Sequence, residues 1–160
     1  LNQITAAKKN LEDEPIALRE LNLIDCVKDS VFQVRSLGTK KSISLDSDFG
    51  QLNVPHDPAL LKRAIVNLLE NGLEAAEEQV RVTITKRESN AIIRICDDGA
   101  GMDEKKVSLY LQGRGQSGKA NRQAFGLAST NHIVRSHGGK LIHRRSDLGG
   151  TSFEIRLEVV

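Results

Sequence analysis

Three stretches of the chain repeat their apolar residues with the spacing of an α-helix. The first runs over about 21–37 and is followed by Gly38, a residue that commonly caps helices. The second opens at Asp57-Pro58, a suitable N-cap and first turn, and continues to about residue 78. The third runs over about 126–136 and is stopped by two glycines. We therefore expect three principal helices.

Alternating apolar and polar residues predict strands between these helices. A short strand is expected near 43–45, and two hairpins over about 80–96 and 140–159. Residues 99–124 are irregular apart from a short helix over 103–109. This order predicts an α/β sandwich of the α+β class, with a mixed, mostly antiparallel sheet of about five strands and about three helices packed on one face.

Composition agrees with a globular domain in a reducing compartment. Hydrophobic residues make up 39% and charged residues 28%, and no run approaches the roughly 20 apolar residues of a membrane helix. Cys26 and Cys96 lie in apolar stretches without metal-ligand spacing, so we expect buried, reduced thiols. We interpret 15–160 as one domain and 1–14 as the end of an upstream helix or a linker. The expected location is the cytoplasm, with any membrane tether outside this chain.

Polar residues interrupt one face of the second helix and the end of a buried strand. Asn67 and Asn71 are four positions apart, although Asn is a poor residue for a helix interior. After the strand over 91–96 comes the glycine turn 97–102 (DDGAGM), where a carboxylate can accept a hydrogen bond from an amine. Each feature alone is also compatible with ordinary surface structure.

A basic segment without Asp or Glu extends from 105 to 146. Within it, 113–120 (GRGQSGKA) resembles a dinucleotide motif and a P-loop, but Ala120 stands where a P-loop needs Ser or Thr. A cationic loop that closes over phosphates fits better, beside the alternative of a plain surface loop. Gly126 opens the third predicted helix, and free N–H groups at a helix start favour phosphate. Aromatic residues are only 3% of the chain, so we expect no nucleic-acid partner.

The order and spacing of these motifs resemble the GHKL superfamily of ATP-binding domains, and most closely the catalytic domain of sensor histidine kinases. Residues 67–75 (NLLENGLEA) look like the N box, and 97–101 (DDGAG) look like the first glycine box. Residues 126–128 (GLA) look like the tail of the second glycine box, and 150–153 (GTSF) like the closing G-T-x-F element. The resemblance covers roughly residues 15–160.

The resemblance implies a site for ATP and Mg²⁺. Asn71 would ligate the metal, and Asp97 would hydrogen-bond the adenine amino group with help from Thr151 through a water. Residues 107–125 would form a lid, in which Arg114 or Lys119 reaches the γ-phosphate. The residues implied in nucleotide binding are Asn67, Asn71, Ala75, Asp97, Gly99, Gly101, Met102, Arg114, Gly118, Lys119, Gly126, Leu127 and Thr151.

Within the superfamily, the ATPases place a general-base carboxylate where this chain has Asn67, so rapid water activation is disfavoured. The histidine kinase branch implies an ATP donor that positions the γ-phosphate and has no other catalytic residue in this chain. The acceptor would be a histidine on an upstream dimerisation domain, which then phosphorylates a response regulator receiver domain. None of His56, His132, His137 and His143 has the acceptor motif, so we expect that histidine outside the chain.

Two positions depart from the family pattern and leave alternatives open. Glu74 stands where the family often has a basic residue, and Phe125 replaces a glycine of the second glycine box. These departures allow a pseudokinase that regulates a partner through nucleotide binding or contact. An ATPase or a serine kinase of the same superfamily is a further alternative.

Overall fold

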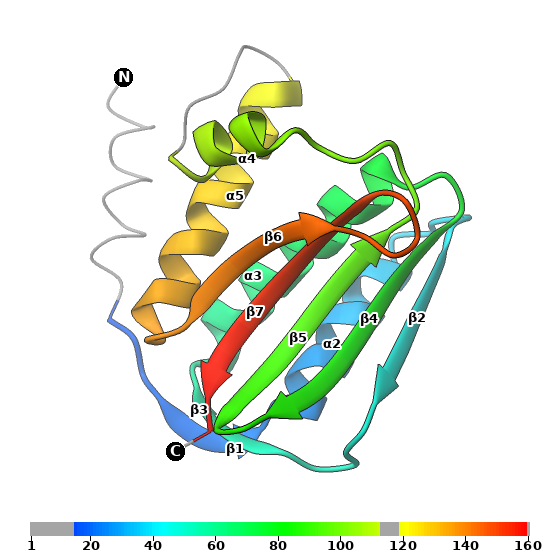
Figure 1. The fold of residues 1–160 in the computed structure, drawn as a ribbon. Helices are drawn as coiled ribbons and strands as arrows, with labels where there is room; N and C mark the ends of the chain where they lie inside the picture. Colours follow the sequence, from blue (N-terminus) through cyan, green and yellow to red (C-terminus); the bar gives the residue numbers. More distant parts are fainter. Residues whose placement is uncertain (1–14, 113–118, 160) are drawn as a thin grey trace.

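Five strands form the central sheet, in the order β2-β4-β5-β7-β6 (Figure 1). The computed structural model describes residues 15–112 and 119–159. β2 pairs parallel with β4, and the other neighbours in this sheet are antiparallel, as predicted. The strands are β2 (Ser42–Ser47), β4 (Gln79–Arg87), β5 (Asn90–Asp97), β6 (Lys140–Arg145) and β7 (Thr151–Glu158).

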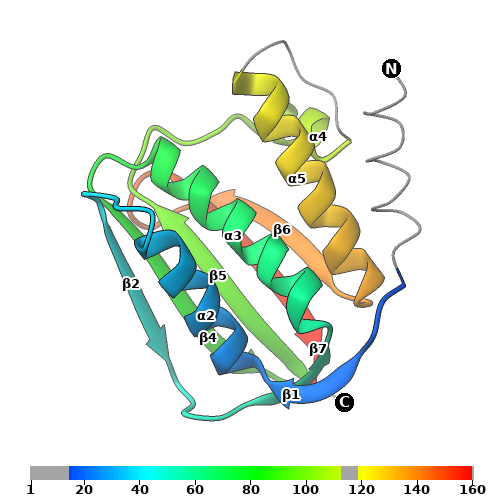
Figure 2. The ribbon, with the colours of Figure 1, turned by 180° about the vertical axis from the view of Figure 1, so that it is seen from behind.

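Helices α2 (Leu23–Arg35), α3 (Pro58–Ala75) and α5 (Lys119–Ser136) cover one face of this sheet (Figures 1 and 2). The short α4 (Glu104–Leu111) packs against α5. The fold class predicted from the sequence is therefore confirmed. Over residues 15–112 and 119–159, no helix lies on the opposite face of the sheet.

The core lies between the sheet and these helices. Inward-facing side chains of β4, β5 and β7 meet the apolar stripe of α3, and both sets are almost completely buried. Cys26 and Cys96 are buried and unpaired, as predicted, and burial raises the pKa of Cys26 to about 12. Within the described part of the chain, no helix is long and apolar enough to cross a membrane.

A second, two-stranded sheet was not predicted. β1 (Arg19–Asn22) pairs antiparallel with β3 (Asn53–His56) at one end of the fold. Each strand has four residues and β3 contains Pro55, so neither shows a clear alternation. α2 consequently starts at Leu23 rather than near 21, because the Asn22 side chain accepts hydrogen bonds from Ile24 N (3.1 Å) and Leu52 N (3.0 Å).

Asp57 joins three segments at the start of α3. Its Oδ1 accepts from Leu60 N (3.2 Å) as the predicted N-cap, and its Oδ2 accepts from Ala17 N (3.0 Å). Its own backbone N–H donates to Nε2 of His137 (3.0 Å), just beyond the end of α5. The entering chain, the start of α3 and the end of α5 are therefore held by one residue.

Two helix boundaries differ from the sequence prediction. α3 ends at Ala75 instead of about residue 78, because the Asp98 carboxylate accepts hydrogen bonds from the next N–H groups, at 77, 78 and 79 (2.8–3.3 Å). α5 starts at Lys119, so the prediction that Gly126 opens this helix is wrong. Residues 119–125 (KANRQAF) consist mostly of good helix formers, and Phe125 stands where a glycine would interrupt the helix.

Candidate nucleotide-binding site

A cavity of about 410 Å³ opens between the C-terminal half of α3, the adjoining ends of β5 and β7, and the pair α4–α5. Its volume lies in the range of small-molecule sites, and its lining is apolar with a few polar groups, as such sites usually are. The lining residues are Leu68, Asn71, Gly72, Ala75, Ile95, Asp97, Gly101, Met102, Lys106, Tyr110, Gln123, Thr151 and Phe153.

Asp97 ends β5 at the floor of this cavity and is almost fully buried. Its Oδ1 accepts hydrogen bonds from the backbone N–H groups of Gly99 (2.9 Å) and Thr151 (3.2 Å). Burial raises the pKa of Asp97, although these two N–H groups act in the opposite direction. Because the described partners occupy Oδ1, Oδ2 remains available to accept a hydrogen bond from a ligand.

Thr151, at the start of β7, contributes a second polar group to the cavity. Its Oγ1 is buried and has no hydrogen-bond partner among the residues that the structure describes. A buried hydroxyl without a partner is unfavourable, so such a group is a natural partner for a ligand or an ordered water. Asp97 and Thr151 thus present an acceptor and an unsatisfied hydroxyl to the same cavity.

Two glycines allow this close packing. A side chain at Gly99 would overlap the carbonyl group of Ala75, and one at Gly150 would overlap the Asp97 carboxylate. Gly101 has a φ of +86°, which favours glycine over other residues. Gly150 was not among the residues expected to bind nucleotide, and its role is to let β7 approach Asp97.

Asp98 holds the connection between α3 and β4 next to this site, and no role was predicted for it. Burial alone would raise the pKa of Asp98, but hydrogen bonds from the N–H groups of Glu78, Gln79 and Glu77 outweigh it and lower the pKa. The ionised carboxylate therefore fixes the connection between α3 and β4. Adjacent aspartates have different tasks, because Asp97 faces the cavity and Asp98 binds backbone.

Helix α3 places Asn71 and Ala75 on the cavity wall, whereas Asn67, one turn earlier, is not among the lining residues. One amide oxygen is a small contribution to a metal site. Mg²⁺ usually keeps several waters and is held by substrate phosphates together with one or two protein oxygens, so Asn71 fits a metal that arrives with a nucleotide. The described residues contain no group of three or more His, Cys, Asp or Glu that would bind a metal by itself.

The helices α4 and α5 supply lining residues that sequence reasoning missed. Tyr110 is 3% exposed, and the Lys106 ammonium lies 5.7 Å from the centre of its ring, a cation–π contact. Gln123 completes this side of the cavity. Tyr110 is the single tyrosine of the chain, but its position on a short helix gave no sign that it would face the site.

The remaining predicted site residues are placed differently. Leu127 belongs to the hydrophobic core rather than to the cavity lining, and Gly126 lies inside α5, where its N–H is not a free helix terminus. Arg114 and Gly118 lie outside the described residues, as does the side chain of Lys119. The expected contacts of these residues with phosphate stay predictions.

Comparisons with known proteins agree with this arrangement. The family model described as "Histidine kinase-, DNA gyrase B-, and HSP90-like ATPase" matches residues 56–160. The two-component sensor PhoQ of Pseudomonas aeruginosa is 31% identical over 122 residues, which are 75% of this chain and 27% of that protein. Sporulation kinase B of Bacillus subtilis is 25% identical over 160 residues, 98% of this chain and 36% of that protein. The chain thus spans about a third or less of the length of these relatives.

Two solved structures show the same fold. The mycobacterial sensor histidine kinase MprB superposes with a TM-score of 0.76 at 22% identity, covering 89% of this chain and 97% of that one. The catalytic domain of the histidine kinase ThkA superposes with a TM-score of 0.79 at 18% identity, covering 89% and 96%. At these identities the likeness concerns the fold.

Proposed function

The chain belongs to the family of histidine kinase-, DNA gyrase B- and HSP90-like ATPases, and on this premise we propose that it binds Mg²⁺-ATP and donates the γ-phosphate to a histidine on an upstream dimerisation domain. The phosphohistidine then passes its phosphoryl group to the receiver domain of a response regulator. We also propose that the domain works in the cytoplasm. The observation that carries the proposal is the pairing of Asp97 with Thr151 on the floor of the cavity.

Adenine recognition follows from the donors and acceptors of this pair. Oδ2 of Asp97 accepts a hydrogen bond from the exocyclic amine, and the Thr151 hydroxyl satisfies its hydrogen bond through the base or a bridging water. Ala75, Met102 and Ile95 provide apolar walls for the ring. The phosphates would then extend along α3 toward Asn71, whose amide oxygen would help to hold a Mg²⁺ ion that neutralises phosphate charge.

Two residues of α3, Asn67 and Glu70, favour transfer of the phosphoryl group to a protein acceptor over hydrolysis of ATP. Asn67 occupies the position one turn before Asn71, and an amide does not accept a proton from water as a carboxylate does. The preceding residue, Glu70, is exposed and is not among the cavity-lining residues. Catalysis therefore consists of positioning ATP and neutralising charge, since neither Asn67 nor Glu70 supplies a general base for water.

His56 and His137 are poor phosphoryl acceptors, and neither His132 nor His143 has the acceptor motif, which supports an acceptor on another domain. His56 is 1% exposed, and both ring nitrogens of His137 are engaged, with Ile133 O (2.8 Å) and Asp57 N (3.0 Å).

Leu109 on α4 and Phe125 on α5 are 47% and 50% exposed, on two helices that pack together. We assign these exposed side chains to the contact with the upstream dimerisation domain.

Calorimetric titration with Mg²⁺-ADP tests nucleotide binding, and labelled ATP with an added upstream histidine domain tests transfer. We expect binding that requires Mg²⁺, a large loss of affinity in Asn71→Ala, and label on the added domain. Rapid ATP hydrolysis without an acceptor would instead identify an ATPase.

Absence of binding at millimolar nucleotide would favour a pseudokinase. The observation that motivates this second candidate is the continuous helix across Phe125 and Gly126, which removes free N–H groups from a position expected to bind phosphate. A Phe125→Gly variant that gains nucleotide affinity would then show which residue blocks the site.

A further inference from the structure

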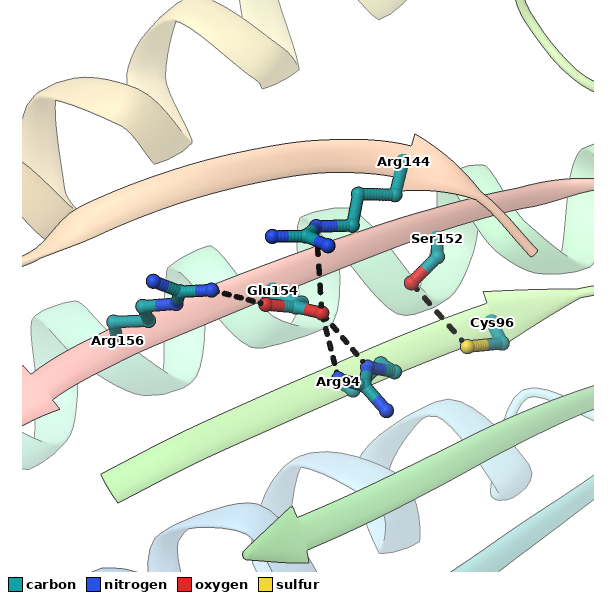
Figure 3. Close-up of polar contacts among 6 residues, drawn as sticks. All are labelled: Arg94, Cys96, Arg144, Ser152, Glu154 and Arg156. Atoms are coloured by element: carbon teal, nitrogen blue, oxygen red, sulfur yellow. Dashed lines mark hydrogen bonds and ion pairs between the residues drawn. The ribbon is translucent and has the colours of Figure 1, made fainter. Parts of the chain in front are cut away.

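The face of the central sheet that carries no helix in the described part of the chain holds an organised cluster of charges (Figure 3). Register places Arg94 of β5 opposite Glu154 of β7, with Arg156 two positions along β7. Arg144 reaches Glu154 from β6. We call these four residues the arginine cluster. It lies on the opposite face of the sheet from α3, which forms a wall of the nucleotide cavity.

Glu154 organises the cluster from a buried position. Its side chain is 2% exposed and accepts from Nε (2.9 Å) and Nη2 (2.7 Å) of Arg94, while Nη2 of Arg156 lies 3.3 Å from the other oxygen. Nε of Arg144 lies 4.0 Å from Oε1 of Glu154. Burial alone would raise the pKa of Glu154, but Arg94, Arg156 and Arg144 outweigh it and lower the pKa. One ionised carboxylate thus faces three guanidinium groups, so the cluster carries a net charge of +2.

These guanidinium groups still present donors to solvent. The side chains of Arg94, Arg144 and Arg156 are 43%, 61% and 33% exposed. Because Glu154 already holds Arg94 and Arg156, these two side chains lose little conformational freedom when a further anion binds. The register extends the positive charge along the same face to Arg81 and Arg87 on β4 and Lys140 on β6.

We propose that this face of the sheet is a docking surface for an acidic segment of a partner protein, whose carboxylates pair with the free N–H donors of the arginine cluster. The guanidinium fork matches carboxylate geometry in a bidentate manner. The cluster spans β5, β7 and β6, two strand spacings or about 10 Å, which suits a few carboxylates on one helix or loop. The nucleotide cavity and this surface can be occupied together.

The composition of this face favours a discrete acidic protein segment over a continuous polyanion. Asp46 and Glu158 share the face with the basic residues, so an extended phosphate backbone or an anionic bilayer would also meet carboxylates. The described residues of the face include no aromatic side chain that would stack on bases. Ile92 is 7% exposed and Ile142 is partly buried, so the face gives little apolar anchor and we expect a weak contact that is sensitive to salt.

The test uses a fluorescently labelled hexaglutamate peptide at low salt, with anisotropy for affinity and backbone amide shifts for the location. We expect shifts at outward positions of β5, β6 and β7, and a loss of affinity of about threefold in Arg144→Gln. Arg135→Gln on α5 makes the same charge change on the helix side and is expected to bind like the unchanged protein. Equal losses in both variants, or shifts confined to the nucleotide cavity, would overturn the proposal.

A second variant, Glu154→Gln, tests whether binding becomes tighter when the negative charge of the cluster is removed. Glu154→Gln removes the carboxylate that competes for the arginines, so a folded variant should bind hexaglutamate more tightly, by about twofold or more. Unchanged or weaker binding in a folded Glu154→Gln protein would contradict the proposal. Should this variant not fold, Arg144→Gln still decides. Anionic lipid vesicles and a short DNA duplex serve as competitors, and tighter binding of either than of hexaglutamate would assign the surface to another class of partner.

Discussion

The Asp97 carboxylate and the backbone N–H of Thr151 form a hydrogen bond of 3.2 Å that joins the end of β5 to the start of β7. Since Gly99 N donates to the same Oδ1 at 2.9 Å, the orientation of the carboxylate is fixed before any ligand arrives. Oδ2 is therefore a preset acceptor in the cavity. We therefore propose that nucleotide selectivity depends on this single oxygen.

Asp97→Asn should exchange the preferred base. The amide keeps an acceptor toward Gly99 and Thr151 but places an NH₂ donor where Oδ2 stood, so it opposes the amine of adenine and suits the carbonyl of hypoxanthine. We expect affinity for ADP to fall by about tenfold or more, and affinity for IDP to rise relative to ADP. Calorimetry with both nucleotides measures this, and an equal loss for both would mean that the residue acts on folding instead.

Thr151→Val should separate stability from binding. Valine has nearly the shape of threonine and removes a buried hydroxyl that has no partner among the described residues. The free energy of unfolding without nucleotide should stay equal or rise by up to about 1 kcal/mol, while ADP affinity falls by about fivefold. Urea unfolding and ADP titration give the two quantities. A variant that is destabilised and yet binds ADP normally would show that the hydroxyl serves the fold.

Two glycine substitutions should have opposite effects on stability. A Cβ at Gly99 would overlap the Ala75 carbonyl, so Gly99→Ala should lower the free energy of unfolding by about 1–3 kcal/mol. A Cβ at Gly126 meets no atom within 4 Å, so Gly126→Ala should raise it by about 0.5–1 kcal/mol, since alanine favours a helix interior. Loss of ADP binding in a stabilised Gly126→Ala protein would mean that α5 opens at this glycine when nucleotide binds.

Stability should fall between about pH 7 and pH 5 through His56. Burial lowers its pKa, its Nδ1 lies 2.7 Å from Val54 O, and its Nε2 is buried without a partner among the described residues. Below the ordinary histidine pKa of about 6.5, the unfolded chain binds the proton more readily, so the free energy of unfolding decreases as pH falls. Above about pH 6.5 the histidine is neutral in both states, so the lowered pKa of His56 no longer makes the free energy of unfolding depend on pH.

His56→Asn keeps a donor for Val54 O but does not titrate, and its melting temperature should depend less on pH over this range. His132→Asn, at an exposed position of α5, is the matched control and should follow the unchanged protein. Burial also lowers the pKa of His143, so part of the dependence should remain in the His56 variant. Identical pH profiles for all three proteins would exclude the proposed role of His56.

Local signals in the sequence were sufficient for most of the fold. The alternation of β4, β5 and β7 and the Asp57-Pro58 helix start depend on nearest neighbours along the chain, and both were predicted. The start of α5 was not, because Gly126 suggested a boundary where residues 119–125 in fact continue the helix. The β1–β3 pair was missed because its partners are short and far apart in sequence.

The candidate site was predictable in part for the same reason. Asn71, Asp97 and Thr151 lie in motifs with recognisable spacing, and the structure places all three around one cavity. Lys106, Tyr110 and Gln123 reach it because α4 packs against α5, a contact that no local pattern encodes. Likewise, nothing in the sequence distinguishes Asp98, which holds backbone, from its neighbour Asp97.

The three-way junction at Asp57 determines how the domain would carry mechanical load. Tension at Ala17 would be passed to the Asp57 carboxylate, which caps the start of α3, while the backbone N–H of Asp57 links to His137 just beyond the end of α5. α3 has 18 residues and is about 27 Å long, and Asn71 lies near its far end. Gln123 lies near the far end of α5. A pull on the entering chain would therefore also act on α3 and α5, the two long helices that reach the cavity.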